Sequence, residues 1–323
     1  MQLHVIACRH PLSSRHDPGG RRKQLIGAPI YLVNYSNWDM ISTLHSTVAL
    51  VHNCITQSFQ SLPRRDRPSS QAVRRLAQSI SLVCLNIRTA CLVDFCRIPS
   101  PQRTLPHLID NLRKKGCTGC AHTLAIFDSV GGDVFFVNST MLSHKLDGSS
   151  PYDSDSVSDC QPLCSASIKL ENVTFISLDK PPRALESLPE PLVSLLSYLR
   201  VHLAGPPGET CSNKRVSDVP SVLVLPSSNL SPYVQIPLAG ILLDYPFAYI
   251  PPFRAEPQDN EAFLSGETLD VFEISLRSSE TAELLELMKF SCPSEFTNPE
   301  GHEHLWIESH FDVWPKWSDY SHD

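Results

Sequence analysis

One stretch of the chain, residues 221–253, constrains the fold more than any other. It reads SVLVLPSSNLSPYVQIPLAGILLDYPFAYIPPF: a short apolar run, a Ser-rich turn, a longer apolar segment and, after Tyr245-Pro246, a second short apolar run. Short apolar runs bounded by turn residues are typical of buried strands, whereas the longer segment has the length of a helix. The stretch therefore predicts a strand–helix–strand unit of an α/β protein.

The rest of the chain continues this alternation. Gly131-Gly132 separates two apolar runs and predicts a β-hairpin. The expected strands are 90–95, 123–128, 134–138, 173–179, 221–225, 247–251 and 268–276. The expected helices are 38–59, 71–88, 105–115, 141–146, one within 184–203, 236–243 and 280–290. This order predicts an α/β fold with a three-layer mixed, mostly parallel sheet, one β-hairpin and an N-terminal helical extension.

Changes in composition along the chain predict its organisation. We expect a poorly ordered basic N-terminus at 1–37 and N-terminal helices at 38–89. An α/β domain at 90–291, with a mobile Ser-rich loop at 147–166, and a His/Trp-rich acidic tail at 292–323 would follow. No apolar run reaches the roughly 20 residues that span a bilayer, and the N-terminus lacks the pattern of a signal peptide. We therefore expect a soluble intracellular protein, cytoplasmic or nuclear, with no membrane partner.

Charge is unevenly distributed. Residues 1–90 carry a formal charge of +8 and residues 91–323 a charge of −15, which gives the chain its net charge of −7. An acidic body repels a phosphate backbone, so we expect it not to bind nucleic acid. The basic N-terminal part could still act as an arm.

Two aspartates that end apolar strands, Asp94 and Asp179, are the candidate catalytic residues. In an open parallel sheet the ligand crevice lies beyond the carboxyl ends of the strands, so the two carboxylates would meet there. Such a pair can bind Mg²⁺ or act as acid and base, and Ser228 in the turn 227–229 is a third candidate. The alternative is that each aspartate caps its own turn. Asp128 precedes the hairpin and is expected to be a turn residue.

The chain has eleven cysteines. Cys84 and Cys91 lie in apolar runs and are expected to behave as small core residues. Cys117 and Cys120 form a C-x-x-C pair, which could indicate a zinc site with Cys160 and Cys164 or a thioredoxin-like motif. The pair follows a predicted helix and precedes a strand, the wrong order for thioredoxin, so unrelated thiols are the preferred interpretation.

Several short segments, in this order and spacing, resemble a small eukaryotic family of unknown function that is named for a chromosome-one open reading frame (number seventy-four). The likeness covers about residues 80–290. The matching segments are Leu92-Val93-Asp94, the helix at 108–116, the hairpin around Gly131, and the segments 175–179, 240–246, 248–249 and 269–272. The chain departs from the family at Asp244, where a small residue is expected. The resemblance supports the fold boundaries and implies no mechanism.

Two classes of function remain open. The acidic body, the Ser-rich loop and the aromatic tail favour a non-catalytic interaction or adaptor protein with a protein partner. Asp94, Asp179 and Ser228 favour a metal-assisted hydrolase or transferase that would use Mg²⁺. The distance between the two carboxylates discriminates between them.

Overall fold

The computed structural model describes residues 3–12, 29–35, 38–115, 118–147, 170, 173–179, 181–204, 220–227, 230–252, 267–278 and 284–297. The chain divides into two compact units. Unit 1 comprises residues 1–43 and 254–323, and unit 2 comprises residues 44–253. The boundary at 253 falls inside the α/β domain that we expected at 90–291. The Ser-rich loop from 148 onward and the tail from 298 onward lie outside the described residues.

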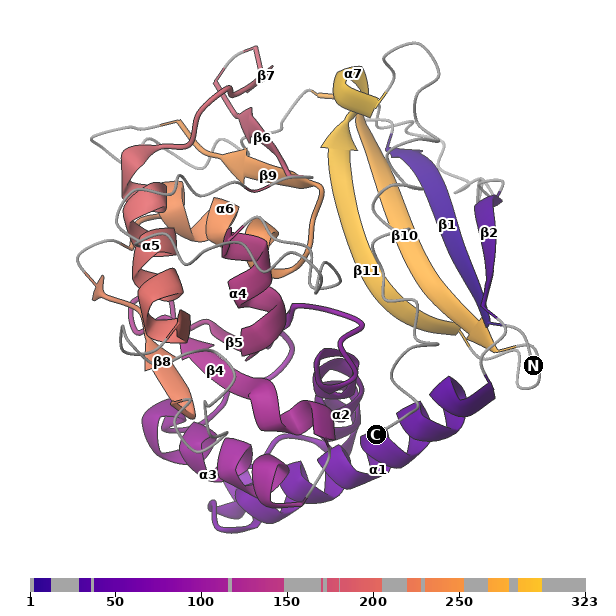
Figure 1. Ribbon diagram of the computed structural model, residues 1–323, viewed down its shortest axis with the longest axis vertical. Helices are drawn as coiled ribbons and strands as arrows, with labels where there is room; N and C mark the ends of the chain where they lie inside the picture. The colour runs from indigo at the N-terminus through magenta and orange to yellow at the C-terminus, as the bar shows by residue number, and fades with distance from the viewer. Residues whose placement is uncertain are drawn as a thin grey trace, which may run out of the picture. The chain divides into compact units, whose positions relative to one another are not determined.

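Unit 2 is built around a four-stranded mixed sheet in the order β3-β5-β4-β8. Figure 1 labels β5, β4 and β8 of this sheet. Its strands are β3 (Ala90–Leu92), β4 (Thr123–Phe127), β5 (Val134–Asn138) and β8 (Val222–Val224). The expected hairpin is confirmed, because β4 and β5 are antiparallel neighbours joined through the Gly-Gly turn. The expectation of a mostly parallel sheet was wrong. The hairpin lies within the sheet, so β5 is antiparallel to both of its neighbours and only β4 with β8 is parallel there.

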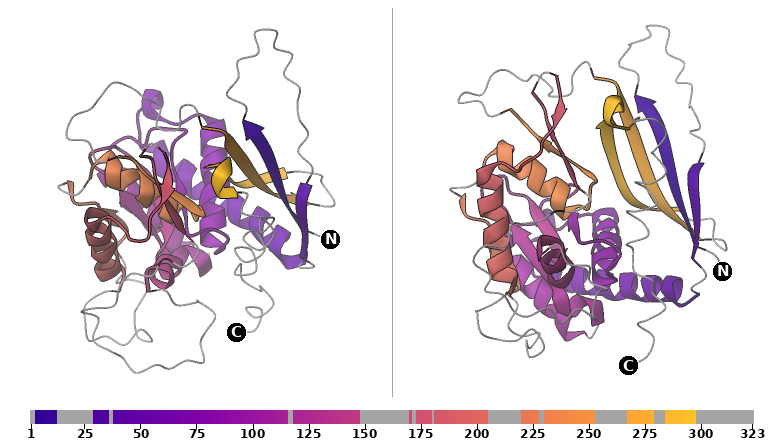
Figure 2. Two further views of the ribbon diagram at one scale, coloured as in Figure 1. Left: turned by 90° about the horizontal axis from the view of Figure 1, so that it is seen from above. Right: turned by 45° about the horizontal axis from the view of Figure 1, so that its top comes forward.

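Helices pack on both faces of this sheet (Figures 1 and 2). Successive strand residues point to opposite faces. Ala125 and Phe127 therefore belong to one core cluster, with residues of α1, α2 and α3. Leu124 and Ile126 belong to another, with residues of α4, α5 and α6. The helices are α1 (Trp38–Gln60), α2 (Ser70–Cys84), α3 (Pro101–Lys114), α4 (Ser139–Asp147), α5 (Glu190–Ala204) and α6 (Pro232–Leu242), with the 3-10 turns η1 (Arg64–Asp66) and η2 (Thr118–His122).

The six helices that the sequence predicted in unit 2 are confirmed, with shifted ends. Ser69 caps α2, since its Oγ accepts a hydrogen bond from Ala72 N at 3.2 Å. The helix stops at Cys84, four residues earlier than predicted. α3 begins four residues earlier than predicted, with Pro101 in its first turn, where a proline has no hydrogen bond to lose.

A second, three-stranded sheet in unit 2 has the order β7-β6-β9. It comprises β6 (Thr174–Ser177), β7 (Arg183–Ala184) and β9 (Phe247–Ile250), and β6 is parallel to β9. Helix α6 packs closely on β9 at Gly240. A Cβ atom added to Gly240 would lie only 3.1 Å from Cβ of Ala248 in β9. The strand–helix–strand unit is therefore confirmed as a sequence of elements, but its two strands, β8 and β9, belong to different sheets.

Unit 1 contains a four-stranded antiparallel sheet in the order β11-β10-β1-β2 (Figure 1). Its strands are β1 (Leu3–Leu12), β2 (Pro29–Tyr35), β10 (Leu269–Ser278) and β11 (Leu284–Pro293), followed by the short helix α7 (Ser294–Thr297). Phe272 and Phe290 face each other across β10 and β11, with ring centroids 5.0 Å apart. We expected no strand within residues 1–37, and the structure has two there, β1 and β2.

The prediction of a helix at 280–290 was wrong, because the structure has strand β11 at Leu284–Pro293. Leu, Glu, Met and Lys are good helix formers, and they dominate this segment. Pairing with β10 prevails, because it buries Met288, Phe290 and Cys292 at alternate positions. A bulge beside Ile274 also turns Leu287 inward, so the buried positions lose the strict alternation from which a strand could have been predicted.

Candidate functional site

The two candidate aspartates lie at the ends of strands in different sheets. Asp94 follows β3 in the four-stranded sheet, and Asp179 follows β6 in the three-stranded sheet. Both side chains are exposed. We expected them to meet because neighbouring parallel strands share a carboxyl edge, and that reasoning does not hold for strands of separate sheets.

Asp179 takes part in contacts within its own turn. Its Oδ2 accepts a hydrogen bond from Ser177 Oγ at 2.7 Å, and its backbone N lies 3.3 Å from the same hydroxyl. Arg183 Nη2 lies 3.7 Å from Oδ2, in an ion pair with both side chains largely exposed. Asp94 acts on Cys96: burial raises the pKa of this thiol, and the nearby negative charge of Asp94 raises it further.

The third candidate lies outside the described residues. Of the turn 227–229, Ser227 is described, and it is exposed, with its carbonyl 3.4 Å from Leu230 N. Ser228 and Asn229 are not described. The turn leads into α6, whose first backbone N–H groups bond to the carbonyl of Ser231.

Asp128 shapes the β4–β5 turn, as its position in the sequence predicted. Its Oδ1 accepts hydrogen bonds from Val130 N at 2.8 Å and Gly131 N at 3.0 Å. Its Oδ2 accepts one from Gln235 Nε2 of α6. The side chain is 2% exposed. Asp128 therefore holds both the hairpin turn and a contact to the neighbouring helix.

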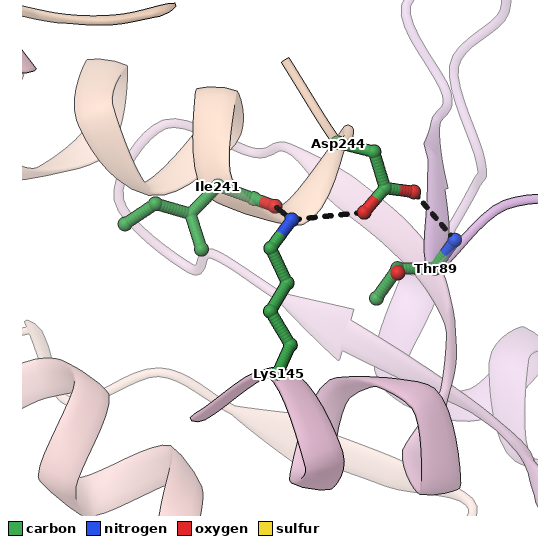
Figure 3. A network of polar contacts seen from close by, with 4 residues as sticks. All are labelled: Thr89, Lys145, Ile241 and Asp244. Atoms are coloured by element: carbon green, nitrogen blue, oxygen red, sulfur yellow. Dashed lines mark hydrogen bonds and ion pairs between the residues drawn. The ribbon is translucent and has the colours of Figure 1, made fainter. Parts of the chain in front are cut away.

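Lys145 and Asp244 form a largely buried ion pair in unit 2 (Figure 3). Lys145 Nζ, in the last turn of α4, lies 2.8 Å from Asp244 Oδ1 and 2.7 Å from the carbonyl of Ile241. Asp244 Oδ2 accepts a hydrogen bond from Thr89 N at 2.7 Å. Burial alone would raise the pKa of Asp244, but Lys145 and the Thr89 amide hold that pKa below its ordinary value.

Asp244 also ends helix α6. Its φ of 60° is left-handed, its N–H bonds to the carbonyl of Ile241, and Tyr245 N bonds to that of Gly240. This is the Schellman pattern, in which the left-handed position is usually a glycine. The resemblance led us to expect a small residue here. An aspartate is found because its carboxylate gains Lys145 and Thr89 as partners, which offsets the cost of the left-handed backbone.

Helix α2 ends in the same pattern with an asparagine. Asn86 has a φ of 55°, and Ile87 N bonds to the carbonyl of Leu82. Asn86 Oδ1 accepts a hydrogen bond from Asn138 Nδ2 at 2.6 Å, and Asn138 Oδ1 accepts one from Met141 N at 3.0 Å, which caps α4. Asn138 N in turn donates to the carbonyl of Thr89, the residue bound to Asp244. One polar network thus joins the ends of α2 and α6 to α4.

A third polar group lies at the amino ends of β4 and β8. Ser221 Oγ donates to Asp110 Oδ1 at 2.7 Å, and Arg113 Nη2 donates to the carbonyl of Thr123 at 2.9 Å. Burial lowers the pKa of His122, and the charge of Arg113 lowers it further. Because Asp110 and Arg113 are both on α3, the group holds this helix against the sheet. Sequence reasoning missed it, since its members are spread over more than one hundred residues.

The cysteines give one confirmation and one surprise. Cys84 and Cys91 are buried as expected. Cys84 Sγ, however, lies 2.9 Å from Cys120 Sγ, a pairing that nothing in the spacing predicted. The zinc and thioredoxin interpretations both involve Cys117, which lies outside the described residues.

Exposed apolar side chains flank the carboxyl ends of β4 and β8. Val224 in β8 is 39% exposed, Ile236 in α6 is 39% exposed and Val130 in the hairpin turn is 58% exposed. Asp128 bonds to Val130 N and to Gln235, the neighbour of Ile236, so the hairpin turn and α6 meet at this residue. Leu225 N bonds to the carbonyl of Phe127, which places Val224 at the same end. Val222 and Val224 point to the same face of β8, the face that α1, α2 and α3 cover, and away from α6. We call these two residues the β8-edge patch.

Within the part of the chain that the structure describes, no group of three or more His, Cys, Asp and Glu side chains is placed to hold a metal ion. No helix among the described residues is long and apolar enough to cross a membrane. The His residues of the tail lie beyond residue 297, outside the described residues.

These features define a mixed α/β protein whose polar clusters connect its helix ends and turns. The chain belongs to a family described as a domain of unknown function, DUF4504, whose model matches residues 58–316. Membership in a family of unknown function is thus confirmed, over a longer segment than the resemblance covered. No curated protein and no solved structure matches the chain.

Proposed function

We propose that unit 2 is a three-layer α/β domain that binds another protein without catalysing a reaction. The proposed contact is the edge strand β8, against which an extended segment of the partner pairs as an added strand. The observation that carries the proposal is the exposed Val224 on a strand at the end of the sheet order. An intracellular location, and membership in the narrower eukaryotic family named above, are parts of the same proposal.

The hydrogen bonds of β8 support pairing on its outer side. Ala125 N donates to the carbonyl of Ser221, and Leu225 N donates to that of Phe127. In a parallel ladder, alternate residues direct both main-chain groups to the same neighbour. The main-chain groups of Val222 and Val224 therefore point away from β4. Tyr198 of α5 donates to the carbonyl of Val224 at 3.2 Å, so among the described residues Val222 and the N–H of Val224 are left for a partner strand.

The side chains around β8 define the chemistry of the partner. Strand addition takes its affinity from main-chain hydrogen bonds and its specificity from alternate side chains. The β8-edge patch favours apolar residues at alternate positions of the partner. The net charge of −7 favours a basic partner segment, whose encounter with the chain would be accelerated at low salt.

The alternative is a metal-assisted hydrolase or transferase that uses Asp94, Asp179 and Ser228. Calorimetry with Mg²⁺ tests it on the full chain and on Asp94→Asn with Asp179→Asn. Micromolar-to-millimolar binding that the double variant loses would favour the enzyme. Equal heats of Mg²⁺ binding from the wild type and the double variant, both folded, would exclude the enzyme alternative.

A selection experiment tests the interaction proposal. Random linear peptides are displayed and selected on the immobilised full chain, and each enriched peptide is then measured against two variants. Val224→Lys places a positive charge in the β8-edge patch. Gln60→Lys adds the same charge at the exposed C-terminus of α1, where a cation is tolerated.

The proposal predicts basic peptides with alternating apolar residues. They would bind the wild type and Gln60→Lys equally and bind Val224→Lys at least about tenfold more weakly, a loss of about 1.4 kcal/mol. Peptides that bind all three proteins equally would contradict β8 as the contact. The absence of any enriched peptide would count against strand addition as the mode of binding.

A further inference from the structure

Two cysteines from distant parts of the chain have their sulfur atoms in contact. Cys84 ends helix α2, and Cys120 lies in η2, thirty-six residues further on. Their Sγ atoms are 2.9 Å apart, whereas a disulfide bond is about 2.05 Å long. Both residues are buried, at 1% and 0% exposure. Bond formation requires the two sulfur atoms to approach each other by about 0.9 Å and the side chains to adopt the disulfide dihedral.

The backbone brings the two thiols together. A Cβ at Gly119 would lie 1.4 Å from the carbonyl oxygen of Cys84, so only a glycine permits η2 to come this close to α2. Thr123, which begins β4, places its Oγ1 3.5 Å from Cys84 Sγ and donates to the carbonyl of Gly119 at 3.4 Å. The contact between the sulfur atoms is therefore set by the packing of α2 against η2.

We propose that Cys84 and Cys120 are a redox-reactive pair that forms a reversible intrachain disulfide when the protein meets a small-molecule disulfide. In the first step a transient local opening of η2 exposes the buried thiols, one of them loses its proton, and the thiolate attacks a sulfur of the oxidant. A mixed disulfide forms and one thiolate of the oxidant leaves and takes up a proton. In the second step the other cysteine, deprotonated, attacks the protein sulfur of the mixed disulfide. The second oxidant thiol leaves, so the protein loses two hydrogens and the oxidant is reduced to two thiols.

The bond would close a loop that contains β3 and all of α3. It would connect the end of α2 to the segment that leads into β4, two elements of one core. Restricting the unfolded chain in this way stabilises the folded state. The oxidised protein should therefore resist heat better than the reduced protein, and reduction should reverse the effect.

Cys91 provides the matched control. It is buried in β3, and burial raises the pKa of its thiol to about 12, so its thiolate is rarely formed. Replacing it with alanine removes one buried thiol of the same size without touching the pair. Alanine is preferred to serine at all three positions, because a buried hydroxyl would need a hydrogen-bond partner.

The test incubates the full-length native protein with oxidised glutathione. Remaining thiols are then blocked in denaturant, and the peptides are mapped by mass spectrometry. We expect a crosslinked peptide that joins Cys84 to Cys120, and a melting temperature that rises by roughly 5–15 °C and returns after reduction. Cys91→Ala should show the same crosslink and shift, and Cys84→Ala and Cys120→Ala should show neither.

The wild-type map decides the matter even if a variant fails to fold. If both cysteines of the folded wild type are still fully blocked as thiols after long incubation with the oxidant, the proposal is wrong. It is also wrong if Cys120 is recovered in a disulfide with a different cysteine.

Discussion

Lys145 and Asp244 form an ion pair in which Nζ and Oδ1 are 2.8 Å apart, and this pair joins helix α4 to the end of helix α6 (Figure 3). Both side chains are largely buried, with 18% and 15% exposed. Removing one member of a buried pair leaves the other charge without its partner, which costs more than the pair itself contributes. The pair is therefore a sensitive point of unit 2.

Replacing Asp244 with asparagine should destabilise the protein. Asparagine tolerates the left-handed backbone at this position, so the change removes the charge and leaves the helix end intact. We expect the free energy of unfolding to fall by about 2–4 kcal/mol, measured by urea denaturation. Arg183→Met, which breaks the exposed pair with Asp179, serves as the control and should cost at most about 0.5 kcal/mol. Equal effects of the two changes would contradict this account.

The same pair predicts a pH dependence. The pKa of Asp244 is lowered in the folded protein, so the folded state favours the ionised carboxylate. Its contribution is fully present above the ordinary aspartate pKa of about 3.9 and is lost as the pH falls through and below that value. The difference in unfolding free energy between wild type and Asp244→Asn should be constant from about pH 6 to pH 8 and shrink on acidification. A difference that stays constant in acid would show that the pKa is not lowered.

Asp128→Ala should loosen the β4–β5 turn. The change removes the carboxylate of Asp128. Val130 N and Gly131 N lose the oxygen that accepts their hydrogen bonds, and the Gln235 side chain loses its partner. The N–H groups of the exposed residues Val130 and Gly131 can bond to water instead, so each lost hydrogen bond costs only about 0.5–1.5 kcal/mol. Thermal unfolding should detect a summed loss of about 1–3 kcal/mol. Gln235→Ala, which leaves the turn contacts in place, should cost less. The reverse order would mean that the helix contact, and not the turn, is the main role of Asp128.

Gly119→Ala should be among the more damaging single-methyl additions in the chain. The new Cβ would overlap the carbonyl of Cys84, so η2 or the end of α2 must move. Overpacking of this kind costs about 1–3 kcal/mol. Gly132→Ala adds the same methyl where nothing lies within 4 Å, although the φ of 80° there adds strain of its own. Chemical denaturation of both variants compares the two costs, and a smaller loss at Gly119 would contradict the close approach.

The elements of unit 2 could largely be predicted from the sequence, whereas their connections could not. Apolar periodicity predicted α1 and the β4–β5 hairpin, because both patterns are local. The apolar pattern of a strand does not indicate which other strands share its sheet. The apolar runs of β8 and β9 look alike, yet they pair with different strands. In β11, pairing with β10 overrides a sequence that favours a helix.

The candidate site shows the same division. Asp128 was correctly predicted as a turn residue from its position before Gly131-Gly132. Asp94 and Asp179 were paired on the assumption of one parallel sheet, and their strands belong to two sheets. The contact between Cys84 and Cys120 has no signal in the sequence, since it depends on how α2 packs against η2. Asp244 did give a signal. It stands at a helix end where glycine is usual, and the cost of a left-handed backbone at a non-glycine residue has to be offset by contacts of its side chain.

The most direct test of the proposed function is amide hydrogen exchange along β8. Exchange is measured on the full chain alone and with a peptide selected as described above. Strand addition predicts that the N–H groups of Val222 and Val224 exchange more slowly when the peptide is bound, because they become its donors. The amide of Leu225, which already bonds to Phe127, should change little. Protection that appears elsewhere, with Val222 and Val224 unchanged, would contradict β8 as the contact surface.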